Sequence, residues 1–193
     1  QHNPELKTPK APPNWKGTPQ DSKRRFQNLH HPFIPSWLDV MRWKFLQKNP
    51  YKELKKSEIW NLSVMRDESW LARNDDMIVW LGHCTFYIRF NGIQVITDPV
   101  FGNAYPIKRK SEFPINPDHL NSLDYVLLSH DHRDHLDKPS LQLLSRQNPN
   151  ARYLTGLGMR KLINKFTGSD RIVEAGWYQQ SWICIGTGHC RYQ

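Results

Sequence analysis

Six consecutive residues, 130–135, constrain this chain more than any other segment, because they read His-Asp-His-Arg-Asp-His. Three imidazoles, those of His130, His132 and His135, and the carboxylate of Asp134 fall within this span. Imidazole nitrogen and carboxylate oxygen are the donors that zinc prefers after thiolate. Without a cation, the packed groups would repel one another or compete for protons. The run therefore predicts a divalent-metal site, and the alternative is a solvated polar loop.

The spacing of the four donors predicts that the run is a loop. Offsets of 0, 2, 4 and 5 residues scatter around a helix, and on a strand the last donor would point to the opposite face. Before the run, residues 124–129 are short, apolar and β-prone, which predicts a buried strand. After it, Asp137 as N-cap and Pro139 in the first turn predict a helix over 138–146. A loop that follows the carboxyl end of a strand is a usual ligand site in open α/β sheets.

The rest of the chain also predicts mixed α and β structure. Strands are expected at 77–81, 85–90, 93–97, 152–155, 172–174 and 182–185, and a helix at 159–166. The dipeptide Asn91-Gly92 predicts a type I′ hairpin turn between two of these strands. Residues 1–21 hold five prolines and scattered lysines, as is typical of a flexible arm. This pattern by itself predicts one mixed α/β domain.

The histidine run matches the His-x-His-x-Asp-His signature of the metallo-β-lactamase fold. Further segments resemble the branch of that fold that contains N-acyl-phosphatidylethanolamine-hydrolysing phospholipase D. They are Arg24-Arg25-Phe26-Gln27-Asn28, Trp80-Leu81-Gly82-His83-Cys84-Thr85, Thr97-Asp98-Pro99-Val100-Phe101 and residues 124–130. The resemblance covers about residues 22–191 and implies an αββα sandwich. It assigns 22–76 to an N-terminal helical extension, basic in character, and 77–193 to the first half of the sandwich only.

The resemblance also implies roles for individual residues. His130, His132 and the later His189 would hold one zinc ion, and Asp134 and His135 would begin a second zinc site. The two ions would activate water to attack a phosphodiester, with Asp134 as the catalytic residue that orients it.

Two residues outside the run have alternative interpretations. Asp98 either accepts a hydrogen bond from a ligating histidine or serves a local turn. His83 either contacts a metal ligand or faces the substrate, or it is a hydrogen-bonded polar group of the core.

The remaining histidines and the cysteines carry weaker signals. His30, His31 and His119 lie outside the matching motifs and are expected at the surface. Cys84 and Cys184 are expected to be buried apolar residues, whereas Cys190, beside His189, is an alternative thiolate ligand.

The dinuclear site of the resembled family also needs a bridging aspartate and a further histidine from the second half of the fold. The sequence ends at Gln193. We therefore expect a fragment or one piece of a longer protein, which alone binds one metal weakly and is nearly inactive. An uncovered sheet face would invite pairing, so a homodimer is an open alternative.

The net charge of +9 bears on possible partners. Residues 1–60 carry twelve of the Lys and Arg residues against five acids. Nucleic acid, an anionic membrane surface or no partner at all would each suit such a surface. No nucleic-acid-binding motif is visible, so no nucleic acid is expected. No apolar run is long enough to span a bilayer. The location, cytoplasmic or at the membrane periphery, stays open.

A helix over 36–48 is the candidate for membrane contact, within the segment 33–48. Ser36 is its expected N-cap, and Leu38, Met41 and Phe45 recur at helical spacing beside Trp37. Such a helix either packs on the core or lies in a membrane interface, with aromatic and basic residues as anchors.

Three functions follow from these observations. The resemblance favours a zinc-dependent phosphodiesterase of the phospholipase D kind, acting on N-acyl phosphatidylethanolamine or a related lipid. The second is a hydrolase of the same fold that acts on another ester, such as a sugar-phosphate lactone, because a fold does not fix a substrate. The third is a non-catalytic basic binding module.

Overall fold

The computed structural model of the protein describes residues 1–28, 36–59, 62–103, 108–181, 184–185 and 189–190, the last two pairs by their backbone alone. These residues form two compact units. The larger contains Gln1–Gly17 and Ser63–Gln193, and the smaller contains Thr18–Leu62. Each unit is described by itself.

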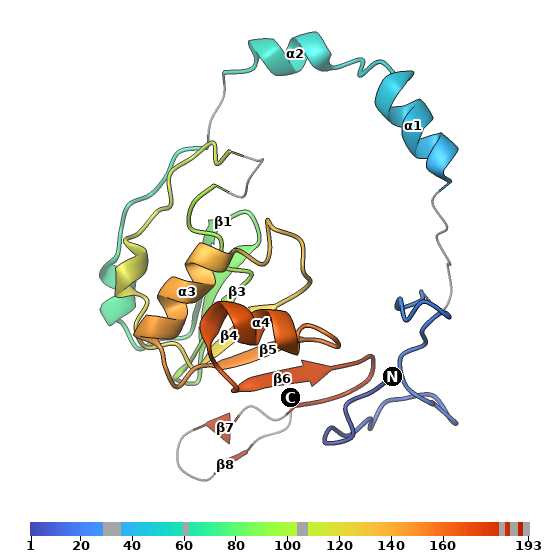
Figure 1. Cartoon of the computed structure of the whole chain (residues 1–193). Helices are drawn as coiled ribbons and strands as arrows, with labels where there is room; N and C mark the ends of the chain where they lie inside the picture. Colours follow the sequence, from blue (N-terminus) through green and yellow to red (C-terminus); the bar gives the residue numbers. More distant parts are fainter. Residues whose placement is uncertain (29–35, 60–61, 104–107, 182–183, 186–188, 191–193) are drawn as a thin grey trace. The chain divides into compact units, whose positions relative to one another are not determined.

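The larger unit is built on a six-stranded sheet whose strands lie in sequence order (Figure 1). The strands are β1 (Met77–Gly82), β2 (Thr85–Phe90), β3 (Ile93–Thr97), β4 (Tyr125–Leu128), β5 (Arg152–Gly156) and β6 (Ile172–Ala175). The first three form an antiparallel meander, and β3 to β6 are parallel. Asn91 and Gly92 join β2 to β3 with φ angles of 50° and 77°, as the predicted type I′ turn requires.

The two faces of the sheet have different environments. One row of paired residues crosses it on the covered face and is almost completely buried from β2 to β6: Val79, Tyr87, Ile96, Val126, Tyr153 and Ile172. The neighbouring row, on the other face, is also mostly apolar but partly or fully exposed: Trp80, Phe86, Thr97, Leu127, Leu154 and Val173. Because side chains alternate along a strand, these two rows define a core side and an uncovered apolar side.

Helices α3 (Lys138–Gln147) and α4 (Arg160–Thr167) cover the core side (Figure 1). Leu141 and Leu144 of α3 and Ile163 of α4 are fully buried and join the core cluster of the sheet. The side chain of Asp137 accepts a hydrogen bond from Ser140 N, so the predicted N-cap is present.

Two 3₁₀ helices and the N-terminal segment complete the larger unit. The 3₁₀ helices are η1 (Ser69–Ala72) and η2 (Pro117–His119). Residues 1–17, part of the predicted flexible arm, contact the segment after β6. There Asn3 N donates to Gln179 Oε1 at 2.8 Å and Gln180 N donates to Lys7 O at 2.9 Å. Two short strands, β7 (Cys184–Ile185) and β8 (His189–Cys190), form a separate antiparallel pair.

The smaller unit contains α1 (Trp37–Phe45) and α2 (Lys52–Ser57). The Ser36 side chain accepts a hydrogen bond from Asp39 N and caps α1, as the sequence predicts. Neither helix has a buried residue. Within the described ranges, no helix combines the length and the apolar character that crossing a membrane would require.

The predicted fold class is confirmed, because the structure is a mixed α/β fold with a six-stranded sheet. The helix over 36–48 is shorter than expected, and the strand at 182–185 is described only as β7. The compact units divide at 17/18 and 62/63, and the predicted domain boundaries at 21/22 and 76/77 stay predictions. The assignment of 77–193 to half of a sandwich stays a prediction.

Candidate metal centre

Three segments meet at the edge of the sheet where β1, β3 and β4 end. These strands run in the same direction, since β1 and β3 both pair antiparallel with β2 and β4 is parallel to β3. The β1–β2 turn, Asp98 after β3 and the loop after β4 therefore lie together. This edge is where the carboxyl ends of parallel strands usually present ligand-binding groups.

Asp98 is the centre of a hydrogen-bond network that joins two of these segments. Its side chain is buried, and its Oδ1 accepts from Ser129 N at 2.8 Å. Its Oδ2 accepts from Ser129 Oγ at 2.7 Å and lies 2.9 Å from His135 Nδ1. Because an ionised carboxylate only accepts, the His135 ring carries its proton on Nδ1. The Nε2 lone pair of His135 is then free for a metal.

The same network orients His130. His130 Nδ1 lies 2.9 Å from Ser129 Oγ, whose single proton is donated to Asp98. The hydroxyl must therefore accept from His130 Nδ1, which leaves Nε2 of this ring free as well. Asp98 thus fixes His135 directly and His130 through Ser129. The hydrogen bond that the sequence suggested for Asp98 is present, whereas the sequence gave no signal for Ser129 beyond its position before the run.

The loop brings its three imidazoles together, as the spacing predicts. The ring centroid of His130 lies 4.5 Å from that of His132 and 4.1 Å from that of His135. The backbone N–H groups of His135 and Leu136 both donate to His132 O, which tightens the loop into a turn. The three rings are therefore neighbours, although the described group of three donors whose ligand atoms all lie within 4.8 Å of one another shares only His135 with this loop.

Asp134 lies between the histidines of two different segments. Its Oδ2 is 3.4 Å from His83 Nε2 in the β1–β2 turn and 3.8 Å from His135 Nε2. The pKa of Asp134 is lowered, chiefly because its own backbone N–H donates to the carboxylate and then because His135, His83 and His132 are near. The carboxylate is therefore ionised and is available to a cation.

Cys84, which the sequence predicts to be a buried apolar residue, is only partly buried. Burial raises the pKa of its thiol, and the charges of Asp98 and Asp134 raise it further. In the described part of the chain, His83, Cys84 and His135 form the one group of three donors whose ligand atoms all lie within 4.8 Å of one another. The sequence did not indicate Cys84 as a possible ligand, because its proximity to His135 depends on how the β1–β2 turn packs beside the histidine loop.

The other predicted ligand, His189, belongs to β8, and its side chain lies outside the described residues. Its role as a ligand stays a prediction. His30 and His31 also lie outside the described residues. The chemistry of the described donors fits a divalent cation, because Nε2 of both His130 and His135 is left free by the network and the carboxylate of Asp134 lies 3.8 Å from Nε2 of His135.

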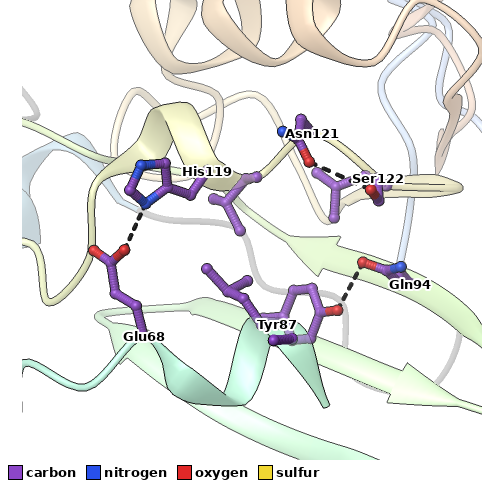
Figure 2. Close-up of a pocket in the computed structure, with 10 residues that line it drawn as sticks. Glu68, Tyr87, Gln94, His119, Asn121 and Ser122 are labelled. Carbon is purple, nitrogen blue, oxygen red and sulfur yellow. Dashed lines mark hydrogen bonds and ion pairs between the residues drawn. The ribbon is translucent and has the colours of Figure 1, made fainter. Parts of the chain in front are cut away.

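A separate cavity of about 400 Å³ lies at the opposite ends of the strands, beside Gln94 at the start of β3 (Figure 2). In it, Tyr87 donates from its hydroxyl to Gln94 Oε1 at 2.8 Å. Glu68 lies beside His119 and accepts from Asn116 N at 2.7 Å. These two contacts, the Asn116 N–H first, lower the pKa of Glu68. Every polar group named here has a partner within the pocket wall, and none of the predicted metal ligands contributes to it.

The chain is similar in sequence to a known domain family and to several known proteins. The sequence pattern of the family described as "Beta-lactamase superfamily domain" matches residues 77–175. An N-acyl-phosphatidylethanolamine-hydrolyzing phospholipase D of Caenorhabditis elegans is 30% identical over 112 residues, which are 53% of this chain and 32% of that protein. A mitochondrial protein of the same description from Saccharomyces cerevisiae is 30% identical over 105 residues, or 52% of this chain and 22% of that one.

One further relative and one solved structure are described as hydrolases. A metal-dependent hydrolase of Hyperthermus butylicus is 32% identical over 99 residues, covering 50% of this chain and 39% of that protein. The solved structure of an isothiocyanate hydrolase from Delia radicum gut bacteria matches with a TM-score of 0.44 and 15% identity, over 56% of this chain and 43% of that one. The chain spans about a third or less of the two phospholipase D relatives.

The matched region, 77–175, begins at the first residue of β1 and ends at the last residue of β6. It therefore contains the whole six-stranded sheet, Asp98 and the histidine loop. The chain belongs to the beta-lactamase superfamily.

Proposed function

We propose that the protein is a metal-dependent hydrolase of phosphodiesters and that the loop after β4 holds its metal. The observation that carries this proposal is the network from Asp98 to His135 and, through Ser129, to His130. It leaves Nε2 of both rings free, and Nε2 of His135 lies 3.8 Å from Asp134 Oδ2. A metal-dependent hydrolase among the relatives supports the same reaction class.

When bound, a divalent cation supplies Lewis-acid activation of water and of a phosphoryl oxygen. His130 and His132, with His189 as a further proposed ligand, would hold one cation through ring nitrogens, and Asp134 and His135 would begin a second site. Asp134 is partly exposed, with 31% of its side chain accessible, and would accept a hydrogen bond from the attacking water. That contact orients the water toward phosphorus. Zinc is the proposed metal, because imidazole and carboxylate are among its preferred donors.

For the substrate we propose N-acyl phosphatidylethanolamine or a related lipid. Two of the relatives carry this activity in their names, at 30% identity over about half of the chain. A sugar-phosphate lactone or another ester is the alternative substrate, and a non-catalytic basic module is the alternative function. Both remain proposals of lower rank because neither is favoured by a contact of the described residues.

The test measures hydrolysis by the complete natural protein, loaded with zinc, on N-acyl phosphatidylethanolamine and on a soluble phosphodiester. His130→Ala should lower turnover about 100-fold or more, because loss of a ligand exceeds the usual effect of losing a residue behind a ligand. His119→Ala, in the separate cavity, is the matched control and should retain full turnover. Wild-type turnover by the His130→Ala protein would exclude the proposed site, and hydrolysis of the soluble ester alone would exclude the lipid substrate.

The helix α1 is the proposed membrane contact. Trp37, Leu38 and Phe45 lie within one arc of the helix and are 66–77% exposed, with Arg42 and Lys44 beside them. Aromatic side chains of this kind enter a lipid interface while basic groups meet anionic headgroups. No described contact favours nucleic acid as a partner, and a homodimer stays a proposal.

We expect the Trp37→Ala/Phe45→Ala double variant to lose most of its binding to phosphatidylserine vesicles in a co-sedimentation assay. Trp43→Ala is the control, because Trp43 is 67% exposed on the same helix but lies about 120° or more from the arc. If the two proteins bind equally, or if the wild type does not sediment with vesicles, α1 is not an interfacial helix.

A further inference from the structure

Arg109 joins the ends of two strands at the edge of the sheet that carries the histidine loop. Its Nη1 donates to Val100 O at 2.9 Å, shortly after β3, and its Nη2 donates to Leu81 O at 2.7 Å, near the end of β1. Its Nε donates to Ser111 O at 2.9 Å. The guanidinium therefore ties the segment that follows β3 to the β1–β2 turn.

The surroundings of this guanidinium suit arginine in particular. The group is half-buried and lies 5.1 Å from the centroid of the Phe113 ring. Burial lowers the pKa of Arg109, but an arginine side chain stays charged in proteins. A buried charge costs free energy unless hydrogen bonds compensate for it. The rigid fork of arginine reaches three separate carbonyl groups here, whereas a lysine has a single nitrogen from which to donate.

Gly82, at the end of β1, leaves the space that the guanidinium fills. Its φ is 104°, and a Cβ added to it would clash with Nη2 of Arg109. A side chain at this position would have to displace the guanidinium and adopt a backbone conformation that only glycine enters freely. Gly82 and Arg109 are therefore fitted to each other.

The turn that Arg109 holds brings His83 to Asp134. Leu81, which accepts from Arg109, comes two residues before His83, and Trp80 Nε1 donates to His83 O at 2.9 Å. His83 Nε2 lies 3.4 Å from Asp134 Oδ2, and the His83 ring lies 5.1 Å from that of His135. The placement of the turn thus decides which polar group lies beside the carboxylate of Asp134.

We propose that Arg109 is a positioning residue, which fixes the β1–β2 turn and so holds His83 beside Asp134 in the geometry that orients the attacking water. This inference rests on the proposed function. The guanidinium contacts main-chain carbonyl groups and an aromatic ring of its own chain, so its effect on hydrolysis passes through the turn. Because a displacement of about 1 Å can slow a reaction about 100-fold, loss of this support is expected to lower the rate measurably.

Steady-state kinetics of the complete natural protein, loaded with zinc and acting on N-acyl phosphatidylethanolamine, test the effect on the reaction. Arg109→Ala should lower kcat about tenfold and change KM less than about twofold, because the residue does not contact substrate. Arg109→Lys should fall between Arg109→Ala and the wild type. Lys110→Ala, at the exposed neighbouring position, is the matched control and should retain the wild-type kcat.

A double-mutant cycle tests whether Arg109 acts through His83. When His83 is already alanine, Arg109→Ala should cause little further loss of kcat, because the two residues belong to one chain of contacts. An equal loss of kcat in the presence and the absence of His83 would overturn the inference, and so would an unchanged kcat in Arg109→Ala.

Alkylation of Cys84 by iodoacetamide reports the position of the turn without any measurement of catalysis. Cys84 is partly buried, and peptide mass spectrometry of the metal-free protein gives its rate of modification. Arg109→Ala and Gly82→Ala should each raise this rate about fivefold or more, because the turn opens more often. Gly92→Ala is the matched control, since Gly92 also has a positive φ, of 77°, but no atom within 4 Å of an added Cβ.

The two measurements separate this inference from the proposed function. Far-ultraviolet circular dichroism verifies that each variant is folded. An unchanged alkylation rate in both Arg109→Ala and Gly82→Ala would show that the guanidinium does not fix the turn, and would leave the proposed function intact. If the wild type does not hydrolyse the lipid, the proposed function and the catalytic role of Arg109 fail together, and the alkylation rates still decide whether Arg109 holds the turn.

Discussion

Replacing Asp98 with alanine is expected to weaken zinc binding about 10- to 100-fold and to lower the free energy of unfolding by about 1–3 kcal/mol. Asp98 is buried and accepts three hydrogen bonds, from Ser129 N, Ser129 Oγ and His135 Nδ1. Its removal leaves these donors without their acceptor and releases both His135 and His130 to rotate. The affinity is measured by isothermal titration with zinc, and the stability by urea unfolding.

Two variants separate the roles of Asp98. Asp98→Asn keeps one oxygen for Ser129 N but has only an amide group at the second position. It should retain most of the stability and still bind zinc weakly. Ser129→Ala breaks the link to His130 alone and should have a smaller effect on zinc affinity than Asp98→Ala. If Asp98→Ala binds zinc as tightly as the wild type, Asp98 does not orient the ligating histidines.

Leu128→Ala should lower the free energy of unfolding by about 2–5 kcal/mol, whereas Leu127→Ala should lower it by less than about 1 kcal/mol. The two leucines are neighbours on β4 and point to opposite faces of the sheet. Leu128 is 1% exposed and belongs to the core cluster under α3 and α4. Leu127 is 40% exposed in the uncovered apolar row. Truncation therefore opens a cavity at one position and removes mainly hydrated surface at the other.

Urea unfolding of the 193-residue chain measures both changes, with equal m-values as the condition for comparing them. An equally large loss in Leu127→Ala would show that this face is covered in solution, by another copy of the chain or by a partner. The test for the proposed homodimer is then the molecular mass of the wild type and of Leu127→Ala at several concentrations. A small effect at Leu128 would contradict the assignment of the core face.

Much of the fold follows from local signals in the sequence. The turn at Asn91-Gly92, the caps at Ser36 and Asp137 and the strand before the histidine run all form where predicted. Each depends on interactions between residues within a few positions of one another. The 3₁₀ helices η1 and η2 have no comparable signal, since short 3₁₀ turns depend on their packing.

The site was predictable in part for the same reason. The spacing of His130, His132, Asp134 and His135 alone excludes a regular helix or strand, and the structure indeed has a loop there. The contact of Asp98 with His135 joins residues 37 positions apart, and the motif suggested it only as one of two alternatives. The approach of His83 and Cys84 to this loop has no signal in the spacing, because it depends on the order of the strands.

The sequence by itself determined that the histidine run forms a loop between a buried strand and a capped helix, because donor spacing, strand propensity and helix capping are local properties. The tertiary structure decided which other segments reach that loop. Parallel alignment of β1, β3 and β4 places the β1–β2 turn and Asp98 at the same edge. Hydrogen bonds from Asp98 to His135, and through Ser129 to His130, then select which nitrogen of these two rings is left free. Such choices are made by contacts between residues distant in the sequence, and local patterns do not encode them.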